Sequence, residues 1–152
     1  MKVEAIVLDA SATAAWLLPD ERSAAAERVY AQLRARRVEA HAPELWLWEC
    51  SNIVVNAVRR SRVMAADAAP LLELLDAVRS RVELVVPEAA QVRATALLAV
   101  DRGLSVYDAA YLWLAGALRL PLLTHDARLA AAAATQGVAC LRHEDLAGST
   151  RA

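Results

Sequence analysis

The sequence predicts a single α/β domain built on a parallel sheet of five strands that is flanked by helices. Expected strands and helices alternate along the chain, and the crossovers are long enough for parallel pairing. The first expected strand is an uninterrupted apolar run over residues 5–8, which is typical of a strand buried on both faces. The length of 152 residues fits one domain, and a hydrophobic content of 58% suffices for a packed core.

The expected helices are each bounded by a proline, a glycine or a capping residue. Pro19 stops the first helix, and the second has acids at its start and arginines at its end, as the helix dipole prefers. Pro70 lies in the early turns of the fourth helix, and Gly103 closes the fifth as its C′ residue. In chain order the expected helices cover residues 12–18, 20–36, 44–60, 65–80, 88–102, 105–119 and 126–136.

The remaining expected strands are short and apolar. Two of them end at Pro43 and Pro87. In chain order they cover residues 38–42, 81–86, 121–124 and 138–141. The chain from His143 onward is expected to fray, so the domain is placed at residues 1–145 and a C-terminal tail at residues 146–152.

The composition narrows the class of protein. A net charge of −1 leaves no basic surface over the whole molecule, so a nucleic acid would have to be held by a local patch or by metal ions. Cys50 and Cys140 lie in separate apolar contexts and show no zinc-ligand spacing with the histidines, which favours reduced thiols in a cytoplasmic protein. Neither a signal peptide nor a charge-free window long enough to span a membrane is expected.

Asp9 follows the first expected strand directly, where the next helix begins. Ligands of open parallel sheets bind at this carboxyl end of the strands. Capping of the next helix, helped by Ser11, explains a single acid here equally well. A functional interpretation therefore requires other acids to converge on Asp9.

Glu49 is the only charged residue between Glu44 and Arg59, in a segment rich in Leu, Trp, Ile and Val. An unpaired carboxylate is costly to bury in such a segment. Asn52 and Asn56 fall on the same side of the expected helix as Glu49, so a polar stripe runs along an otherwise apolar helix. The stripe either faces solvent or presses against the site at the end of the first strand.

Two further acids stand at the start of helices. Asp108 fits a capping box with Ser105, and a carboxylate in a first helical turn is stabilised in the ionised form that a metal ligand needs. Asp126 comes two residues after Thr124, which closes the fourth expected strand, so it repeats the placement of Asp9. Capping alone would explain either acid.

Taken together, the four acids predict a metal site. A cluster of carboxylates repels itself, and protonation relieves the repulsion unless a cation is present. A hard cation such as Mg²⁺ takes one or two carboxylates, some waters and a substrate phosphate. Two such ions can clamp the attacking and leaving oxygens of a phosphodiester. The expected catalytic and metal ligands are Asp9, Glu49, Asp108 and Asp126.

The segments around these acids resemble the PIN domain family, and within it the VapC-type toxins of toxin–antitoxin pairs. The resemblance runs from residue 7 to about residue 141, and its most specific part is LSVYDAAY at residues 104–111. The other matching segments are VLDAS (7–11), PELW (43–46) with ECSN (49–52), and PLLTHD (121–126). By this resemblance the family's acids correspond to Asp9, Glu49, Asp108 and Asp126, and its hydroxyls correspond to Ser11 and Thr124.

The resemblance implies a PIN-like fold and endoribonuclease activity that depends on Mg²⁺ or Mn²⁺. It also implies an RNA substrate, a homodimer and inhibition by a small VapB-like antitoxin. Asn52, Ser11 and Thr124 are expected to support the four acids. The family varies at His125, so this residue is assigned no catalytic role.

Two other functions stay open at this point. A haloacid-dehalogenase-like phosphatase also starts from an aspartate after the first strand, but it typically carries a second acid two residues later, where this chain has Ser11. A PIN fold can also serve only to bind RNA or a protein partner. The intact set of four acids argues against that second alternative.

The helix over residues 44–60 is apolar on nearly all sides. Trp46 and Trp48 are about 160° apart around it, so one packing surface cannot bury both. The core, a second copy of the chain or an antitoxin is therefore expected to enclose this helix. At its far end, Arg59, Arg60 and Arg62 are either ordinary basic residues of a helix C-terminus or phosphate contacts for RNA.

Overall fold

The protein is described by a computed structural model that covers residues 2–149. Its centre is a five-stranded sheet in the order β3-β2-β1-β4-β5, in which all paired strands are parallel. The strands are β1 (Ala5–Leu8), β2 (Glu39–Pro43), β3 (Val82–Val85), β4 (Leu122–Leu123) and β5 (Cys140–Leu141). The predicted α/β class with five parallel strands is confirmed.

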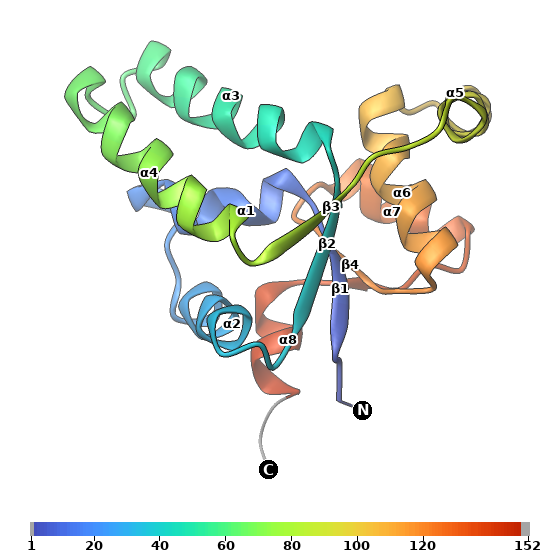
Figure 1. The fold of residues 1–152 in the computed structure, drawn as a ribbon, viewed down its shortest axis with the longest axis horizontal. Helices are drawn as coiled ribbons and strands as arrows, with labels where there is room; N and C mark the ends of the chain where they lie inside the picture. The colour runs from blue at the N-terminus through green and yellow to red at the C-terminus, as the bar shows by residue number, and fades with distance from the viewer. Residues whose placement is uncertain (1, 150–152) are drawn as a thin grey trace.

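Helices cover both faces of the sheet (Figure 1). In chain order they are α1 (Ala10–Leu17), α2 (Ala24–Arg34), α3 (Leu45–Arg59), α4 (Ala68–Arg79), α5 (Ala89–Arg102), α6 (Val106–Leu118), α7 (Ala127–Thr135) and α8 (His143–Gly148). Figure 1 shows α1 to α4 on one side of the sheet and α5 to α7 on the other. Within residues 2–149, no helix is both long enough and apolar enough to cross a membrane.

The middle strand β1 is the most deeply buried part of the sheet. Ile6, Val7 and Leu8 are fully buried, because helices cover both of its faces and strands flank both of its edges. Val7 is in register with Leu122 of β4. Since parallel strands end at the same edge, the residues that follow β1 and β4 come together there.

The two tryptophans of helix α3 lie on opposite sides of it, and only one of them is buried, as their predicted separation around the helix requires. Trp46 is 0% exposed and donates a hydrogen bond from its indole to the Thr13 hydroxyl at 3.0 Å, whereas Trp48 is 78% exposed. Glu49 and Asn56 are half-buried, and Asn52 is exposed. The polar stripe therefore lies along the border between the buried and the exposed sides of the helix.

The start of the second helix differs from the prediction of residues 20–36. Pro19–Glu21 form a separate 3-10 turn, and α2 begins after Ser23, whose hydroxyl accepts a hydrogen bond from the Ala26 amide at 3.1 Å. Arg62 holds this turn by donating to Asp20 at 2.9 Å and to Glu21 at 2.8 Å. The two acids are thus paired in a turn, and this pairing favours the structural interpretation of Arg62 over a phosphate contact.

The expectation that the chain frays from His143 is wrong. His143–Gly148 form α8, which packs against α2, and both His143 and Leu146 are fully buried. Asp145 stabilises the start of this helix by accepting a hydrogen bond from the Arg142 amide at 2.8 Å. Burial of the two side chains supplies the packing that a helix of this length needs in water. Residues 150–152 of the expected tail lie outside the described residues.

Candidate active site

Asp9 stands at the carboxyl end of β1, and its side chain is almost completely buried, at 5% exposure. The hydroxyl of Ser11 donates a hydrogen bond to Asp9 Oδ2 at 2.5 Å, and the hydroxyl of Thr124 donates to the same oxygen at 2.7 Å. Burial raises the pKa of Asp9, the two hydroxyls act against that shift, and the nearby charge of Asp126 adds to it. Two hydroxyl donors therefore orient Asp9.

The loop between β4 and α7 carries Thr124, His125 and Asp126 to the same edge of the sheet. The Asp126 amide donates to the Thr124 hydroxyl at 3.0 Å, and the His125 amide donates to the Ser11 hydroxyl at 2.9 Å. Both hydroxyls thus accept from this loop while they donate to Asp9, so the loop and the start of α1 are fastened together through the carboxylate.

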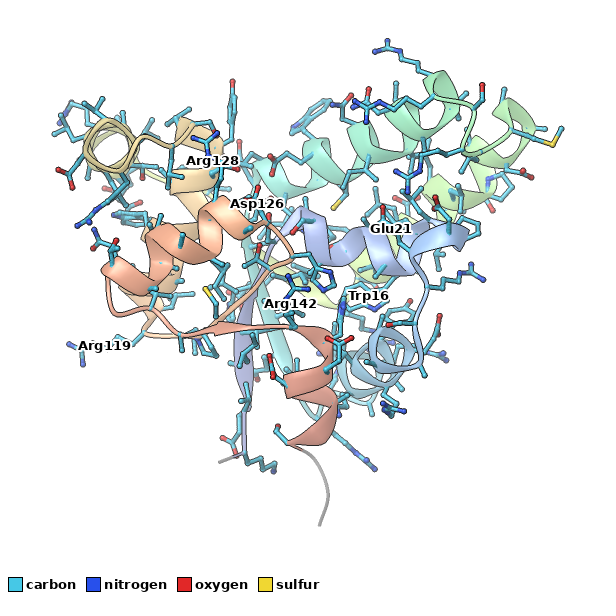
Figure 2. The ribbon with its side chains drawn as sticks, turned by 180° about the vertical axis from the view of Figure 1, so that it is seen from behind. Trp16, Glu21, Arg119, Asp126, Arg128 and Arg142 are labelled. Atoms are coloured by element: carbon cyan, nitrogen blue, oxygen red, sulfur yellow. The ribbon has the colours of Figure 1, made fainter. Side chains whose placement is uncertain are left out.

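Asp126 is the N-cap of α7 and also lies beside Asp9. Its Oδ1 accepts hydrogen bonds from the amides of Arg128 and Leu129 at 2.8 and 3.0 Å, so the predicted capping role is real. Its half-buried carboxylate nevertheless contributes to the raised pKa of Asp9. Figure 2 shows Asp126 and Arg128 at the start of α7. Asp126 can therefore cap α7 and belong to the group of acids at the same time.

Glu49 reaches the group from α3 and is held by a tyrosine. The hydroxyl of Tyr111, a fully buried residue of α6, donates a hydrogen bond to Glu49 Oε2. Burial is the main cause that raises the pKa of Glu49 to about 7; the hydrogen bond from the tyrosine acts against this shift, and the charges of Asp9 and Asp108 add to it. Two of the other three acids, Asp9 and Asp108, thus act on Glu49 through their charges.

Asp108 lies one turn before Tyr111 on α6. Its amide donates to the hydroxyl of Ser105 at 3.0 Å, which confirms Ser105 as the N-cap of this helix. The carboxylate is half-buried and acts on Glu49 through its charge. The fourth predicted acid therefore also belongs to the group.

The four acids come together in pairs but do not form a finished ligand set. Within residues 2–149, no three side chains of Asp, Glu, His or Cys are arranged so that they could hold a metal ion as they stand. The chemistry nevertheless fits a hard cation, since the group offers carboxylate oxygens, and the charges of neighbouring acids add to the raised pKa values that burial gives Asp9 and Glu49. To bind a cation, Glu49 would have to give up its hydrogen bond with Tyr111 or use its other carboxylate oxygen. Asn52, the predicted supporting residue, is exposed on α3 one turn beyond Glu49.

Sequence reasoning missed Tyr111 and the buried His143. Tyr111 follows Asp108 by three residues, a spacing that places both on one side of a helix, and this spacing was the available signal. For His143, no pattern in the neighbouring sequence predicted that its side chain is buried. Its contacts depend on how α8 folds back onto the sheet.

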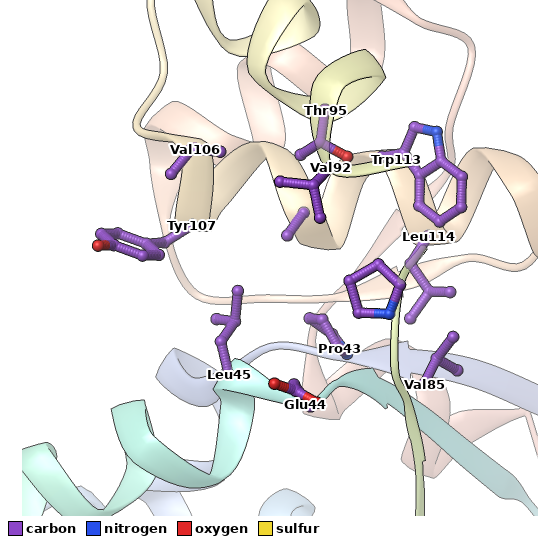
Figure 3. A pocket seen from close by; sticks show the side chains of 12 residues that line it. Pro43, Glu44, Leu45, Val85, Val92, Thr95, Val106, Tyr107, Trp113 and Leu114 are labelled. Atoms are coloured by element: carbon purple, nitrogen blue, oxygen red, sulfur yellow. The ribbon is translucent and has the colours of Figure 1, made fainter. Parts of the chain in front are cut away.

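An apolar pocket of about 200 Å³ lies beside the acids, between α3, α5 and α6. Figure 3 shows Leu45 and Pro43 on one side of it and Val92, Trp113 and Tyr107 on the other. Tyr107 precedes Asp108 directly, so the pocket borders the site without containing its carboxylates. An apolar surface of this kind suits a protein partner better than a phosphate.

Comparison with known proteins gives consistent matches. The family model described as PIN domain matches residues 6–135. A protein of Pyrobaculum aerophilum named Ribonuclease VapC3 is 37% identical over 126 residues, which are 82% of this chain and 92% of that protein. The crystal structure of PAE2754 from Pyrobaculum aerophilum matches with a TM-score of 0.70 and 28% identity, and the match covers 97% of this chain and 96% of the other.

Proposed function

Because the chain belongs to the PIN domain family, we propose that it is an endoribonuclease dependent on Mg²⁺ or Mn²⁺ and the toxin of a VapBC-type pair. The resemblance to VapC-type PIN domains that the sequence predicts is confirmed. The name of the relative, Ribonuclease VapC3, supports the nuclease part of the proposal. The observation that carries it is the pair of buried carboxylates held by hydroxyl donors, Asp9 by Ser11 and Thr124 and Glu49 by Tyr111, on which Asp108 and Asp126 act through their charges.

The four carboxylates are the proposed ligands of the cation. When bound, Mg²⁺ or Mn²⁺ would supply Lewis-acid chemistry, neutralising phosphodiester charge and making water more acidic. Ser11 and Thr124 orient Asp9 by donating to one of its two carboxylate oxygens. Two donors on the carboxylate also stabilise the ionised form that a ligand requires.

The proposed nucleophile is water. Cys50 is fully buried and its pKa is raised by burial, so it is not available as a thiolate. The Ser11 hydroxyl donates to the Asp9 carboxylate and accepts from the His125 backbone amide, so its proton points to a carboxylate and not to an imidazole base. Attack by water on phosphorus leaves a 5′-phosphate and a 3′-hydroxyl, whereas attack by the 2′-hydroxyl of the RNA leaves a cyclic phosphate.

The decisive experiment is incubation of the purified protein with total RNA, with and without Mg²⁺, followed by end-group analysis. Asp9→Asn tests the site, and Glu73→Gln on the exposed side of α4 serves as a matched acid-to-amide control. Metal-dependent cutting with 5′-phosphate ends, lost only in Asp9→Asn, is expected. Cyclic phosphate ends, or cutting that survives EDTA, would contradict the mechanism. RNA binding without cutting would point to the non-catalytic alternative.

The proposed partners are a second copy of the chain and a VapB-like antitoxin, in the cytoplasm. Large apolar side chains are exposed on α3 and α5, namely Trp48 at 78%, Leu97 at 71% and Val100 at 83%. Together with the apolar pocket they are the apolar surface that a protein partner would cover. Light scattering at micromolar concentration is expected to give the mass of a dimer, and a monomer would remove this part of the proposal.

A further inference from the structure

His143, the first residue of α8, is wedged between α1 and the loop that follows β4. Its imidazole is 0% exposed. It lies 5.5 Å from the Trp16 ring of α1 and 4.8 Å from the His125 ring, measured between centroids. His143 Nδ1 and His125 Nε2 are 3.0 Å apart, which is a hydrogen-bond distance. Figure 2 shows Trp16 and Arg142, the residue before His143, close to this loop.

The His125 ring connects α8 to Asp9 through one short path. The backbone amide of His125 donates to the Ser11 hydroxyl at 2.9 Å, and that hydroxyl donates to Asp9 at 2.5 Å. The neighbouring Thr124 donates to the same carboxylate oxygen at 2.7 Å. A change in the position of His125 therefore moves one of the two donors that orient Asp9.

Among the described residues, the imidazole of His143 forms one hydrogen bond, through Nδ1 to His125. The other ring nitrogen, Nε2, is buried there without a hydrogen-bond partner. Burial lowers the pKa of His143 to about 4, so the ring is neutral at pH 7. One of the two facing nitrogens then donates and the other accepts. A polar ring buried with one nitrogen unpaired is unusual for a residue that only fills space.

We propose that α8 is part of the active site, with His143 as a positioning residue that fixes His125 and, through it, the donors on Asp9. This inference rests on the proposed function. The PIN family match ends at residue 135, so α8 lies outside it and family membership does not supply this role. A loop keeps one conformation through its contacts with the rest of the fold, and this contact fixes the loop that carries the Thr124 hydroxyl and the Asp126 carboxylate.

Three variants separate positioning from simple packing. His143→Leu removes the nitrogen and keeps apolar bulk, whereas His143→Asn keeps a polar group close to the place of Nδ1. His125→Leu removes the same hydrogen bond by changing its other partner. Because His125 is only half-buried, this variant tests the contact even if a His143 variant fails to fold. Val78→Ala, in the fully buried face of α4, is the control for a loss of stability elsewhere.

The first readout is hydrogen exchange of the His125 amide in the metal-free protein, followed by NMR. Exchange is expected to be faster in His143→Leu and in His125→Leu, and close to wild type in His143→Asn and Val78→Ala. The second readout is Mn²⁺ affinity by calorimetry, expected to fall roughly 10-fold in the two leucine variants, as for other residues that orient metal ligands. RNA cleavage is expected to fall with it.

Wild-type exchange and Mn²⁺ affinity in the leucine variants would overturn the inference, as would equal losses in Val78→Ala. A wild-type protein that neither binds Mn²⁺ nor cuts RNA would contradict the proposed function. In that case, faster exchange of the His125 amide in His143→Leu still supports the ordering of the loop by α8, and unchanged exchange contradicts it.

Discussion

The hydroxyl of Tyr111 donates a hydrogen bond to the carboxylate of Glu49 and so joins helix α6 to helix α3 within the acid group. Asp108, one turn earlier on α6, acts on the same carboxylate by its charge. Helix α6 thus both donates a hydrogen bond to Glu49, from Tyr111, and places a like charge near it, from Asp108. The protonation of Glu49 can therefore be tested by substituting Glu49 itself on α3 or Tyr111 on α6.

Tyr111→Phe is expected to raise the pKa of Glu49 further above its ordinary value, because the hydrogen bond from the tyrosine lowers it. The loss of a donor to a half-buried carboxylate is also expected to cost about 1–3 kcal/mol of stability at neutral pH. NMR titration of the Glu49 carboxyl carbon measures the pKa. Tyr107→Phe, at an exposed position of α6, is the control, and an unchanged titration in Tyr111→Phe would contradict the assignment.

Metal-free protein is expected to lose stability as the pH rises through about 7. The pKa of Glu49 is about 7 in the folded protein and ordinary in the unfolded chain, so its contribution is full at low pH and is lost on ionisation. Allowing for partial solvation, the loss is on the order of 2 kcal/mol. Because His143 contributes equally to both proteins, the difference in urea unfolding between wild type and Glu49→Gln should show this loss as the pH rises to about 7.

His143 predicts a slope of the opposite sign at lower pH. Its pKa is about 4 in the folded protein and about 6.5 in the unfolded chain, so the unfolded state takes up a proton first as the pH falls. Stability is therefore lost between about pH 6.5 and pH 4, by on the order of 2 kcal/mol. Comparing urea unfolding of wild type and His143→Leu across this range isolates the contribution. Parallel curves would show that His143 is not the group responsible.

Asp108→Asn is expected to weaken Mn²⁺ binding by at least about tenfold while leaving the fold intact. The N-cap survives because Ser105 accepts from the backbone amide of residue 108, not from its side chain. Calorimetry measures the affinity, and Asp101→Asn, at an exposed acid of α5, is the control. Unchanged affinity in both Asp9→Asn and Asp108→Asn would place the metal elsewhere.

The parts of the site that the sequence predicts are those fixed by local pattern. Asp9 and Asp126 each follow an apolar strand, and parallel strands bring such positions to one edge. Glu49 stands out as a charge in an apolar helix. Tyr111 and His143 act through contacts with residues of other elements, and neither partner is evident from the neighbouring sequence; for Tyr111 the only local sign is its three-residue spacing from Asp108.

The errors in secondary structure have a similar origin. Asp20 and Glu21 look like the acidic start of a helix, but their pairing with Arg62, about forty residues later, holds them in a separate turn. The segment after His143 looks too short for a stable helix, and only burial of His143 and Leu146 against the core makes it one. Tertiary contacts overrode local propensity in both places.

The hydrogen bond from Thr124 to Asp9 joins residues 115 positions apart in the chain. During synthesis, β1 leaves the ribosome early, but β4 and the loop behind it follow only after most of the other helices. The acid group therefore cannot assemble on a nascent chain until residue 126 has emerged. A ribosome-bound or truncated product that ends before Thr124 would carry Asp9, Glu49 and Asp108 without Asp126 and without one of the two hydroxyls that orient Asp9, so the group is complete only in a chain that extends past Asp126.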